Sequence, residues 1–178
     1  MNELINIDPN FNKEMFITKI NNIFVLLHTA VMMNDLNRVK HFLSPSLVDK
    51  YEGIIQSLNN RNVIQMYDEL NVKDTNIEEI TIDQGKVTIK VTIVSRYMDY
   101  LVDKDTKKYV SGNNQYRVEK NNSMEFTKDI GASYKSVVAK CPTCGNSISV
   151  NNYGECEFCR TIFNAKDFDW ILTSITTI

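Results

Sequence analysis

Residues 83–103 read DQGKVTIKVTIVSRYMDYLVD, and this stretch decides the fold class. Asp83-Gln84-Gly85 is typical of a tight hairpin turn, because glycine accepts the positive φ that such turns need. After the turn, the apolar residues at odd positions from 87 to 93 alternate with lysine and threonine. A period of two predicts a half-buried strand with one face on the core.

The apolar side of this strand changes in its second half. Val94, Met98 and Val102 are apolar at even positions, while Tyr97 and Leu101 continue the odd series. A strand that exposes a new apolar face along its length needs a bulge or a strong bend. We therefore predict one long, bent strand from the turn to residue 102.

The flanking sequence supplies the partners of this strand. A first strand region is predicted from Glu69 to Ile82, with an interruption near residues 73–76. Residues 103–108 are predicted to form a second turn, followed by return strands over 109–111 and 116–129. Their expected inward-facing residues are Tyr116, Val118, Met124 and Phe126.

Helical periodicity dominates the residues before the sheet. Apolar residues recur at helical spacing over 11–33, which predicts a long amphipathic helix. A second short helix after Asn34-Asp35 would turn Leu36, Val39 and Leu43 inward. Ser44-Pro45 has the pattern of an N-cap followed by proline at the first helical position, and residues 59–62 end this third helix.

Helices followed by a long antiparallel sheet predict an α+β domain. A curved sheet wrapped around an amphipathic helix leaves a concave apolar pocket. We place this domain at residues 1–130 and a second module at 131–178. The second module ends in FDWILTSI, which we expect to be a closing strand beside the sheet, with Phe168, Trp170 and Leu172 on one side and Ile171 on the other.

Composition narrows the classes of function. The net charge is −2, and a nucleic-acid-binding protein usually presents a strongly basic surface instead. No uninterrupted apolar run reaches the roughly 18 residues of a spanning helix, and the first ten residues lack a signal-peptide pattern. We expect a cytoplasmic protein that can lie against the inner face of the membrane.

All four cysteines fall within residues 141–160, CPTCGNSISVNNYGECEFCR. The two CxxC pairs, Cys141 with Cys144 and Cys156 with Cys159, each place two thiolates on one tight turn. Two such turns facing each other supply a tetrahedron of sulfur ligands that suits Zn²⁺. Such a site has no open coordination position, so we expect a structural zinc and no catalysis at the metal.

Three alternatives use the same cysteines. Two disulfides would be strained within each CxxC and do not suit a chain without a secretion signal. A redox-active CxxC motif needs only one pair of cysteines, so the second pair would be unnecessary. Iron in a rubredoxin-like site takes the same four ligands, and the sequence does not separate it from zinc.

The order of motifs resembles the Tim-forty-four-like domain family, named after a subunit of the mitochondrial import motor. The resemblance covers about residues 11–130. The matching positions are Ala30, Asn34-Asp35-Leu36, Phe42-Leu43-Ser44, Leu47, Tyr51, residues 100–103, Gly112, Phe126 and Asp129. Bacterial relatives often carry a C-terminal zinc ribbon similar to CPTCG and CEFC, followed by a stretch like FDWILTSI. One departure is Met124, where the family usually has tryptophan.

The resemblance implies a cone of curved sheet and helices, akin to nuclear-transport-factor-like domains, with an apolar pocket. Phe24, Tyr97, Met124 and Phe126 are the pocket candidates. It implies a binding or transport-related module, associated with a membrane, that takes an apolar ligand, a lipid or a protein segment. The import-motor function is not carried over, and the oligomeric state is not specified.

Two other functions remain open from the sequence. Cone folds of this kind also host enzymes that use a pocket Asp with a Tyr or His, and Asp99 beside Tyr97 and Tyr100, with His28 facing it, is the candidate set. Nucleic-acid binding by the ribbon is the second. The ribbon region has four basic residues, Lys135, Lys140, Arg160 and Lys166. Their positive charge is balanced by the negative charge of Glu155, Glu157, Asp167 and Asp169.

Surface lysines offer one further candidate contact. Lys104, Lys107 and Lys108 make the predicted second turn basic. Each basic residue near an anionic membrane surface contributes about 1 kcal/mol.

The metal assignment yields a direct prediction. Elemental analysis of freshly purified protein should find one zinc per chain. Cys144→Ser should release the metal and unfold the C-terminal module, because structural zinc supplies about 10 kcal/mol or more to small sites, while the helices and main sheet remain folded. Finding the four cysteines as disulfides would contradict the assignment.

Overall fold

A computed structural model describes residues 2–9, 11–129, 139–140, 146–148, 158 and 170–178. The helices are α1 (Asn2–Ile7), α2 (Lys13–Met33), the 3-10 helix η1 (Lys40–Phe42) and α3 (Pro45–Asn60). The strands are β1 (Val63–Asp83), β2 (Lys86–Asp103), β3 (Tyr109–Asp129), β4 (Ala139–Lys140), β5 (Ser147–Ile148) and β6 (Ile171–Thr177). The predicted α+β class is confirmed.

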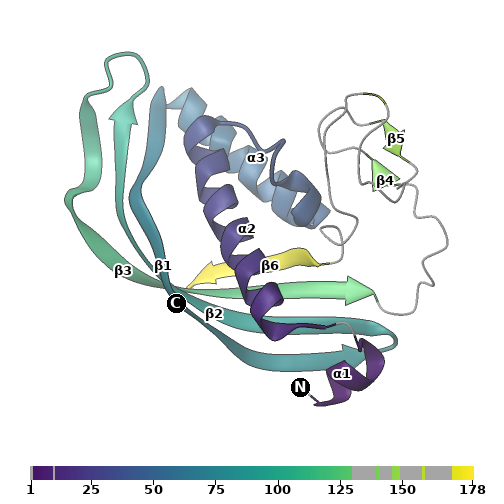
Figure 1. The fold of residues 1–178 in the computed structure, drawn as a ribbon. Helices are drawn as coiled ribbons and strands as arrows, with labels where there is room; N and C mark the ends of the chain where they lie inside the picture. Colours follow the sequence, from purple (N-terminus) through teal and green to yellow (C-terminus); the bar gives the residue numbers. More distant parts are fainter. Residues whose placement is uncertain (1, 10, 130–138, 141–145, 149–157, 159–169) are drawn as a thin grey trace.

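Four antiparallel strands form the main sheet in the order β1-β2-β3-β6. The long strands curve, and α2 and α3 lie within the hollow of the curve (Figure 1). The β1–β2 turn is the predicted hairpin, with Gln84 at φ 47° and Gly85 at φ 79°. Two successive positive φ angles match the right-handed twist of the strands that they connect.

The bend predicted in β2 is confirmed. The register of β2 with β3 shifts between Tyr97 and Asp99. Tyr97 pairs with Val118 and Asp99 pairs with Asn113, so residues 114–117 of β3 all lie opposite Met98. The register of β1 with β2 shifts at the same height, between Asp68 and Asn71. Both neighbours of β2 therefore bulge where its apolar side changes.

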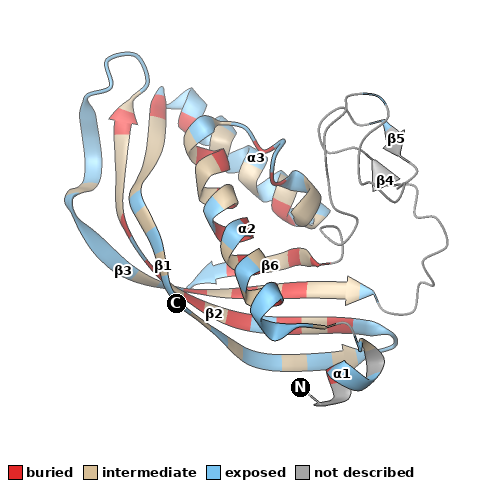
Figure 2. Ribbon diagram, in the orientation of Figure 1, coloured by how far each residue is buried: buried red, intermediate tan, exposed pale blue. Residues whose placement is uncertain are grey.

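Helix α2 is the core helix. Asn12 caps it by accepting a hydrogen bond from the Met15 amide at 2.9 Å. Its seven buried residues are Phe16, Ile20, Ile23, Phe24, Leu27, Ala30 and Val31. They pack against the inner face of the sheet, which carries a run of buried residues along β2 (Figure 2). By length and composition alone α2 could also cross a membrane.

The third helix begins as its sequence indicates. Ser44 caps α3, with its hydroxyl accepting from the Leu47 amide at 3.4 Å, and Pro45 occupies the first helical position. The Ser44 amide donates to the Leu172 carbonyl at 2.9 Å, and Leu43 forms a parallel bridge with Leu172. The start of α3 is thereby tied to β6.

The closing strand is confirmed from Ile171 onwards. β6 pairs antiparallel with β3, placing Met124 opposite Ile175 and Phe126 opposite Leu172. Trp170 is buried, and its ring centroid lies 4.9 Å from that of Phe16. Phe168 lies outside the described residues, as do all four cysteines.

Several boundaries predicted from the sequence are wrong. β1 starts at Val63 rather than at Glu69 and continues through residues 73–76, because its bulges absorb the breaks in alternation. The second helix is only the 3-10 turn η1, although Leu36, Val39 and Leu43 are buried as expected. The two return strands form one strand, β3.

Two residues of β3 that the sequence places in the core are exposed. Tyr116 is 67% exposed and Val118 is 37% exposed. Tyr116 lies in the bulge over residues 114–117, which has no regular partners on β2. Val118 follows the bulge and pairs with Tyr97 in the same register as Met124 and Phe126, so it lies on the inner face but at a height where it stays exposed. Met124 and Phe126 lie beyond the bulge and are fully buried, as predicted.

Glycine is required at residue 112, and this gives a matched test. Gly112 has φ 104°, and a Cβ there would lie 2.5 Å from both the Asp99 carbonyl oxygen and the Tyr100 Cα. Gly112→Ala should therefore lower the free energy of unfolding by about 1–3 kcal/mol, measured by urea denaturation.

Gly53 supplies the control. It lies in α3, and a Cβ there meets no atom within 4 Å. Gly53→Ala should raise the free energy of unfolding by about 0.5–1 kcal/mol, because alanine restricts the unfolded chain and favours helix. Equal stability of the two variants would contradict the described geometry of β3.

Candidate functional site

Three aromatic side chains from three elements meet on the inner face of the sheet. His28 of α2 lies with its ring centroid 4.7 Å from that of Tyr67 on β1 and 5.4 Å from that of Tyr97 on β2. The two tyrosine rings are 5.5 Å apart. We call His28, Tyr67 and Tyr97 the tyrosine–histidine cluster. Phe24 lies one turn before His28 and packs on the apolar side of the cluster. The ring centroids of Phe24 and His28 are 4.2 Å apart.

An ion pair borders this cluster. Lys120 Nζ of β3 donates to the Asp99 carboxylate of β2, and Gln65 Nε2 of β1 donates to the same carboxylate at 2.8 Å. The ammonium group also lies 5.1 Å from the centroid of the Tyr97 ring. Asp99 and Lys120 are partly exposed, at 33% and 28% of their side chains. The cluster therefore has an apolar floor and a charged, solvent-facing border.

The histidine of the cluster is held in its neutral form. His28 Nδ1 lies 2.9 Å from the Phe24 carbonyl oxygen. A carbonyl oxygen only accepts, so Nδ1 carries the proton and Nε2 keeps its lone pair. Burial lowers the pKa of His28, and Lys120 lowers it further, although the hydrogen bond to Phe24 and the charge of Asp99 act in the opposite direction.

The tyrosines are neutral too. Burial raises the pKa of Tyr97 to about 12, with a further contribution from the charge of Asp99. Burial also raises the pKa of Tyr67, and it raises that of the nearby Tyr51 on α3 to about 12. At neutral pH the cluster therefore presents uncharged hydroxyl groups and a neutral imidazole above an apolar core.

The hydroxyl groups of Tyr67 and Tyr97 make no hydrogen bond within the described part of the chain. Neither oxygen belongs to the fully buried polar atoms that lack a partner, so each keeps some contact with solvent, although Tyr97 as a whole is buried. Donors and acceptors that are left open at the edge of an apolar core are the usual polar elements of a ligand site.

The four pocket candidates all lie in the main core, but in two places. Phe24 and Tyr97 border the tyrosine–histidine cluster. Met124 and Phe126 lie on β3 beside β6, and the Phe126 ring centroid is 6.0 Å from that of Phe16. All four are buried, at 0–3% exposure. Their role as pocket-lining residues stays a prediction.

The candidate catalytic set is brought together only in part. His28, Tyr97 and Asp99 come close on the inner face, but Tyr100 does not join them, because its hydroxyl donates to Asp68 of β1. The Asp99 carboxylate is already engaged by Lys120 and Gln65. Sequence reasoning missed Tyr67 because it started β1 at Glu69. It missed Lys120 because a lone lysine in a strand carries no signal of its own.

The predicted metal site lies outside the described residues, and zinc stays a prediction. The flanks of the first CxxC pair are described: β4, Ala139–Lys140, pairs antiparallel with β5, Ser147–Ile148. Within the described ranges, which contain no cysteine, no group of three or more His, Cys, Asp or Glu could hold a metal ion.

The basic turn is ordered by its own side chains. Asp103 Oδ1 accepts hydrogen bonds from the amides of Asp105 and Thr106, and the bonds from Thr106 lower the pKa of Asp103. Lys104 Nζ donates to Asn59 Oδ1 at 3.0 Å, and Lys107 Nζ donates to the Lys104 carbonyl at 2.7 Å. The turn therefore presents its lysines from a defined loop beside the end of α3.

A curved antiparallel sheet wrapped around one long helix defines an α+β cone. The crystal structure of the intermembrane space region of the chloroplast protein ARC6 shares this fold, with a TM-score of 0.50 at 7% identity over 96% of this chain and 98% of that chain. Residues 1–136 match the Tim44-like domain, and the chain belongs to the Tim44-like domain family. No curated protein matches its sequence. The family resemblance seen in the sequence is thus confirmed.

The neutral state of His28 predicts how stability depends on pH. The folded-state pKa lies below the unfolded value of about 6.5, so the unfolded chain binds a proton first as the pH falls. Stability should therefore drop as the pH falls below about 6.5, until the folded-state pKa is passed. In His28→Gln this part of the stability–pH curve should be flatter, as measured by urea denaturation across the pH range.

The other histidine of the chain provides the control. His41→Gln should leave the His28 contribution to the slope in place. An unchanged slope in His28→Gln would show that His28 is not held neutral by burial in the folded protein.

Proposed function

We propose that the chain is a non-enzymatic binding module of the Tim44-like domain family, a family associated with membrane-related import and transport. An apolar ligand segment is held between α2 and the inner face of the sheet, in the region of Phe24, Tyr97, Met124 and Phe126. The polar end of the ligand meets the tyrosine–histidine cluster. The ligand is a lipid, another apolar molecule or an apolar protein segment.

One observation carries the proposal: the hydroxyl groups of Tyr67 and Tyr97 lie at the edge of the apolar core without a hydrogen-bond partner in the described structure. Because these groups are uncharged at neutral pH, they favour a neutral polar group next to an apolar tail over a strongly charged one. The partly exposed Asp99–Lys120 pair marks the open side.

The zinc ribbon has a structural role in this proposal. Cys141, Cys144, Cys156 and Cys159 bind one zinc ion, and the closing strand that follows is buried against β3. Trp170, Leu172 and Ile175 of this C-terminal segment contribute to the main core. The ribbon thus fixes the approach of the closing strand, and the cone carries the binding function.

Membrane contact is the second part of the proposal. The chain works in the cytoplasm and associates peripherally with the inner face of the membrane. The association of Tim44-like family members with membranes supports this placement. Lys107 and Lys108 are exposed in the ordered basic turn and would meet anionic lipid headgroups.

Ligand binding can be tested without creating a cavity. Tyr67→Phe and Tyr97→Phe remove only the two open hydroxyls, whereas truncation of the fully buried Phe126 would cost about 3–5 kcal/mol of stability. With a dansyl-labelled monoacylglycerol as probe, which joins a neutral polar headgroup to an apolar tail, the double variant should bind about tenfold more weakly, because each lost hydrogen bond contributes about 0.5–1.5 kcal/mol.

The matched control is Tyr116→Phe, which removes an exposed hydroxyl on the other side of the sheet and should leave the affinity unchanged. Zinc content and thermal stability should be equal in all variants. If the double variant binds the probe as tightly as the unsubstituted protein, the cluster is not the ligand site.

Membrane association has its own test. Flotation with vesicles should require anionic lipid and should weaken as salt is added, since screening shortens the range of surface charge. Lys107→Glu together with Lys108→Glu should abolish it, while Lys13→Glu, at the far end of the long helix, should not. Equal binding to neutral and anionic vesicles would contradict the electrostatic contact.

A further inference from the structure

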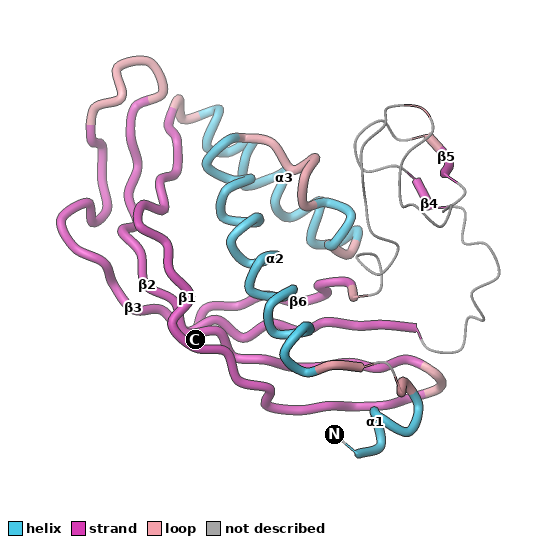
Figure 3. The backbone as a smooth tube through the Cα atoms, viewed as in Figure 1, coloured by secondary structure: helices cyan, strands magenta, loops and turns pink. Residues whose placement is uncertain are grey.

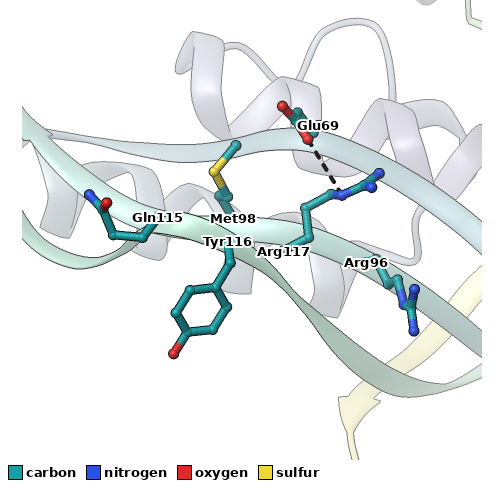
Figure 4. Close-up of a pocket in the computed structure, with 6 residues that line it drawn as sticks. All are labelled: Glu69, Arg96, Met98, Gln115, Tyr116 and Arg117. Carbon is teal, nitrogen blue, oxygen red and sulfur yellow. Dashed lines mark ion pairs between the residues drawn. The ribbon is translucent and has the colours of Figure 1, made fainter.

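Two bulges create a recess on the outer face of the sheet, away from the core. Glu69 in β1 has φ 53°, a conformation that residues other than glycine rarely adopt. At the same height, residues 114–117 of β3 bulge opposite Met98. Between them lies a cavity of about 400 Å³ (Figure 4). Its lining residues are Glu69, Arg96, Met98, Gln115, Tyr116 and Arg117.

The backbone of the β3 bulge is held in place by one side chain. Asn113 Oδ1 accepts from the amides of Gln115 and Tyr116, at 3.1 and 3.4 Å, and Asn113 Nδ2 donates to the Tyr116 carbonyl at 3.0 Å. The recess is therefore built into the strand rather than formed by loose surface side chains. Bulges of this kind often re-aim side chains beside functional sites.

Two arginines are oriented in the recess. Arg117 Nε contacts Glu69 Oε2 at 3.4 Å, and Arg96 Nε donates to Glu119 Oε2 at 2.9 Å. Hydrogen bonds from Lys73 and Arg96 lower the pKa of Glu119, so this carboxylate stays ionised and holds Arg96. The terminal Nη groups of both arginines make no hydrogen bond within the described residues.

The charge and shape of the recess define a ligand class. The lining side chains include Arg96, Arg117 and the Glu69 carboxylate, and Glu119 and Lys73 lie beside Arg96 in a shared ion pair. Three cations and two carboxylates leave an excess of one positive charge. The planar guanidinium fork matches carboxylate and phosphate oxygens. Met98 and the 67%-exposed Tyr116 add an apolar wall. The volume is within the range of about 300–1,000 Å³ for small-molecule sites.

We propose that this outer recess binds the phosphate or carboxylate group of a small soluble molecule, with a flat apolar part of that molecule packed on Tyr116 and Met98. Strand alternation places Arg96 and Tyr97 on opposite faces of β2. The outer recess is thus a second site, separate from the tyrosine–histidine cluster, and its failure would leave the proposed function untouched.

The test uses phenyl phosphate as probe and the whole chain with its zinc. Titration followed by amide NMR should shift the resonances of residues 96–98 and 115–117 in a saturable way. Arg96→Gln and Arg117→Gln should each weaken binding at least about tenfold, as expected for loss of a hydrogen bond to a charged group. Added salt should weaken it too, and benzyl alcohol, which has the ring without the charge, should not bind.

Arg38→Gln is the matched control, because Arg38 is exposed and lies outside the sheet. It should leave the affinity unchanged. Tyr116→Ala is a second variant that does not touch the ion pairs, and it should bring the affinity for phenyl phosphate down to that for inorganic phosphate. Thermal unfolding of each variant confirms that it is folded.

Two results would overturn the proposal. One is phenyl phosphate binding that is equal in the unsubstituted protein, Arg96→Gln and Arg117→Gln, or absent altogether. The other distinguishes the source of the phosphate: binding to vesicles that contain phosphatidic acid, without binding of phenyl phosphate, would show that a membrane surface, and not a soluble molecule, supplies the oxyanion.

Discussion

The burial of β2 between its two neighbours and the long helix is the constraint on which the rest of the fold depends. Val87, Ile89, Val91 and Ile93 are all fully buried. Each such side chain contributes about 1.5–3 kcal/mol when it leaves water. Because β1 and β3 pair along both edges of β2, its alternation fixes which side of the sheet faces α2. A slip of one residue would turn the whole apolar set outward.

The bend in the same strand separates two chemistries. From Val87 to Ile93, the residues of β2 on the inner face are all apolar and pack in the main core with α2. At the bend, Tyr97 and Asp99 bring polar groups to the inner face, while the bulges of β1 and β3 open a recess on the outer face. One irregularity, shared by three strands, thus places the tyrosine–histidine cluster and the outer recess on opposite sides of the sheet.

The sequence predicted the features that depend on local pattern. The β1–β2 hairpin, the bend in β2, the Ser44-Pro45 helix start and the closing strand all follow from turn chemistry, capping and alternation, and the structure confirms them.

Prediction from the sequence failed where tertiary pairing overrides the local pattern. β1 pairs with β2 through three register shifts, so its alternation is broken although the strand is continuous. Alternation predicted that Tyr116 points inward, but it lies in the bulge of β3 and is exposed. The cluster itself depends on long-range contacts between α2, β1 and β2, which no local pattern encodes.

The central claim is that the inner face at the bend is the ligand site. Fluorine NMR of protein labelled with 3-fluorotyrosine tests it most directly, during titration with monododecanoylglycerol, which has a neutral polar headgroup on an apolar chain. We expect saturable shifts of the Tyr67 and Tyr97 resonances, with the Tyr116 resonance unchanged. Shifts at Tyr116 with no change at Tyr67 and Tyr97 would contradict it.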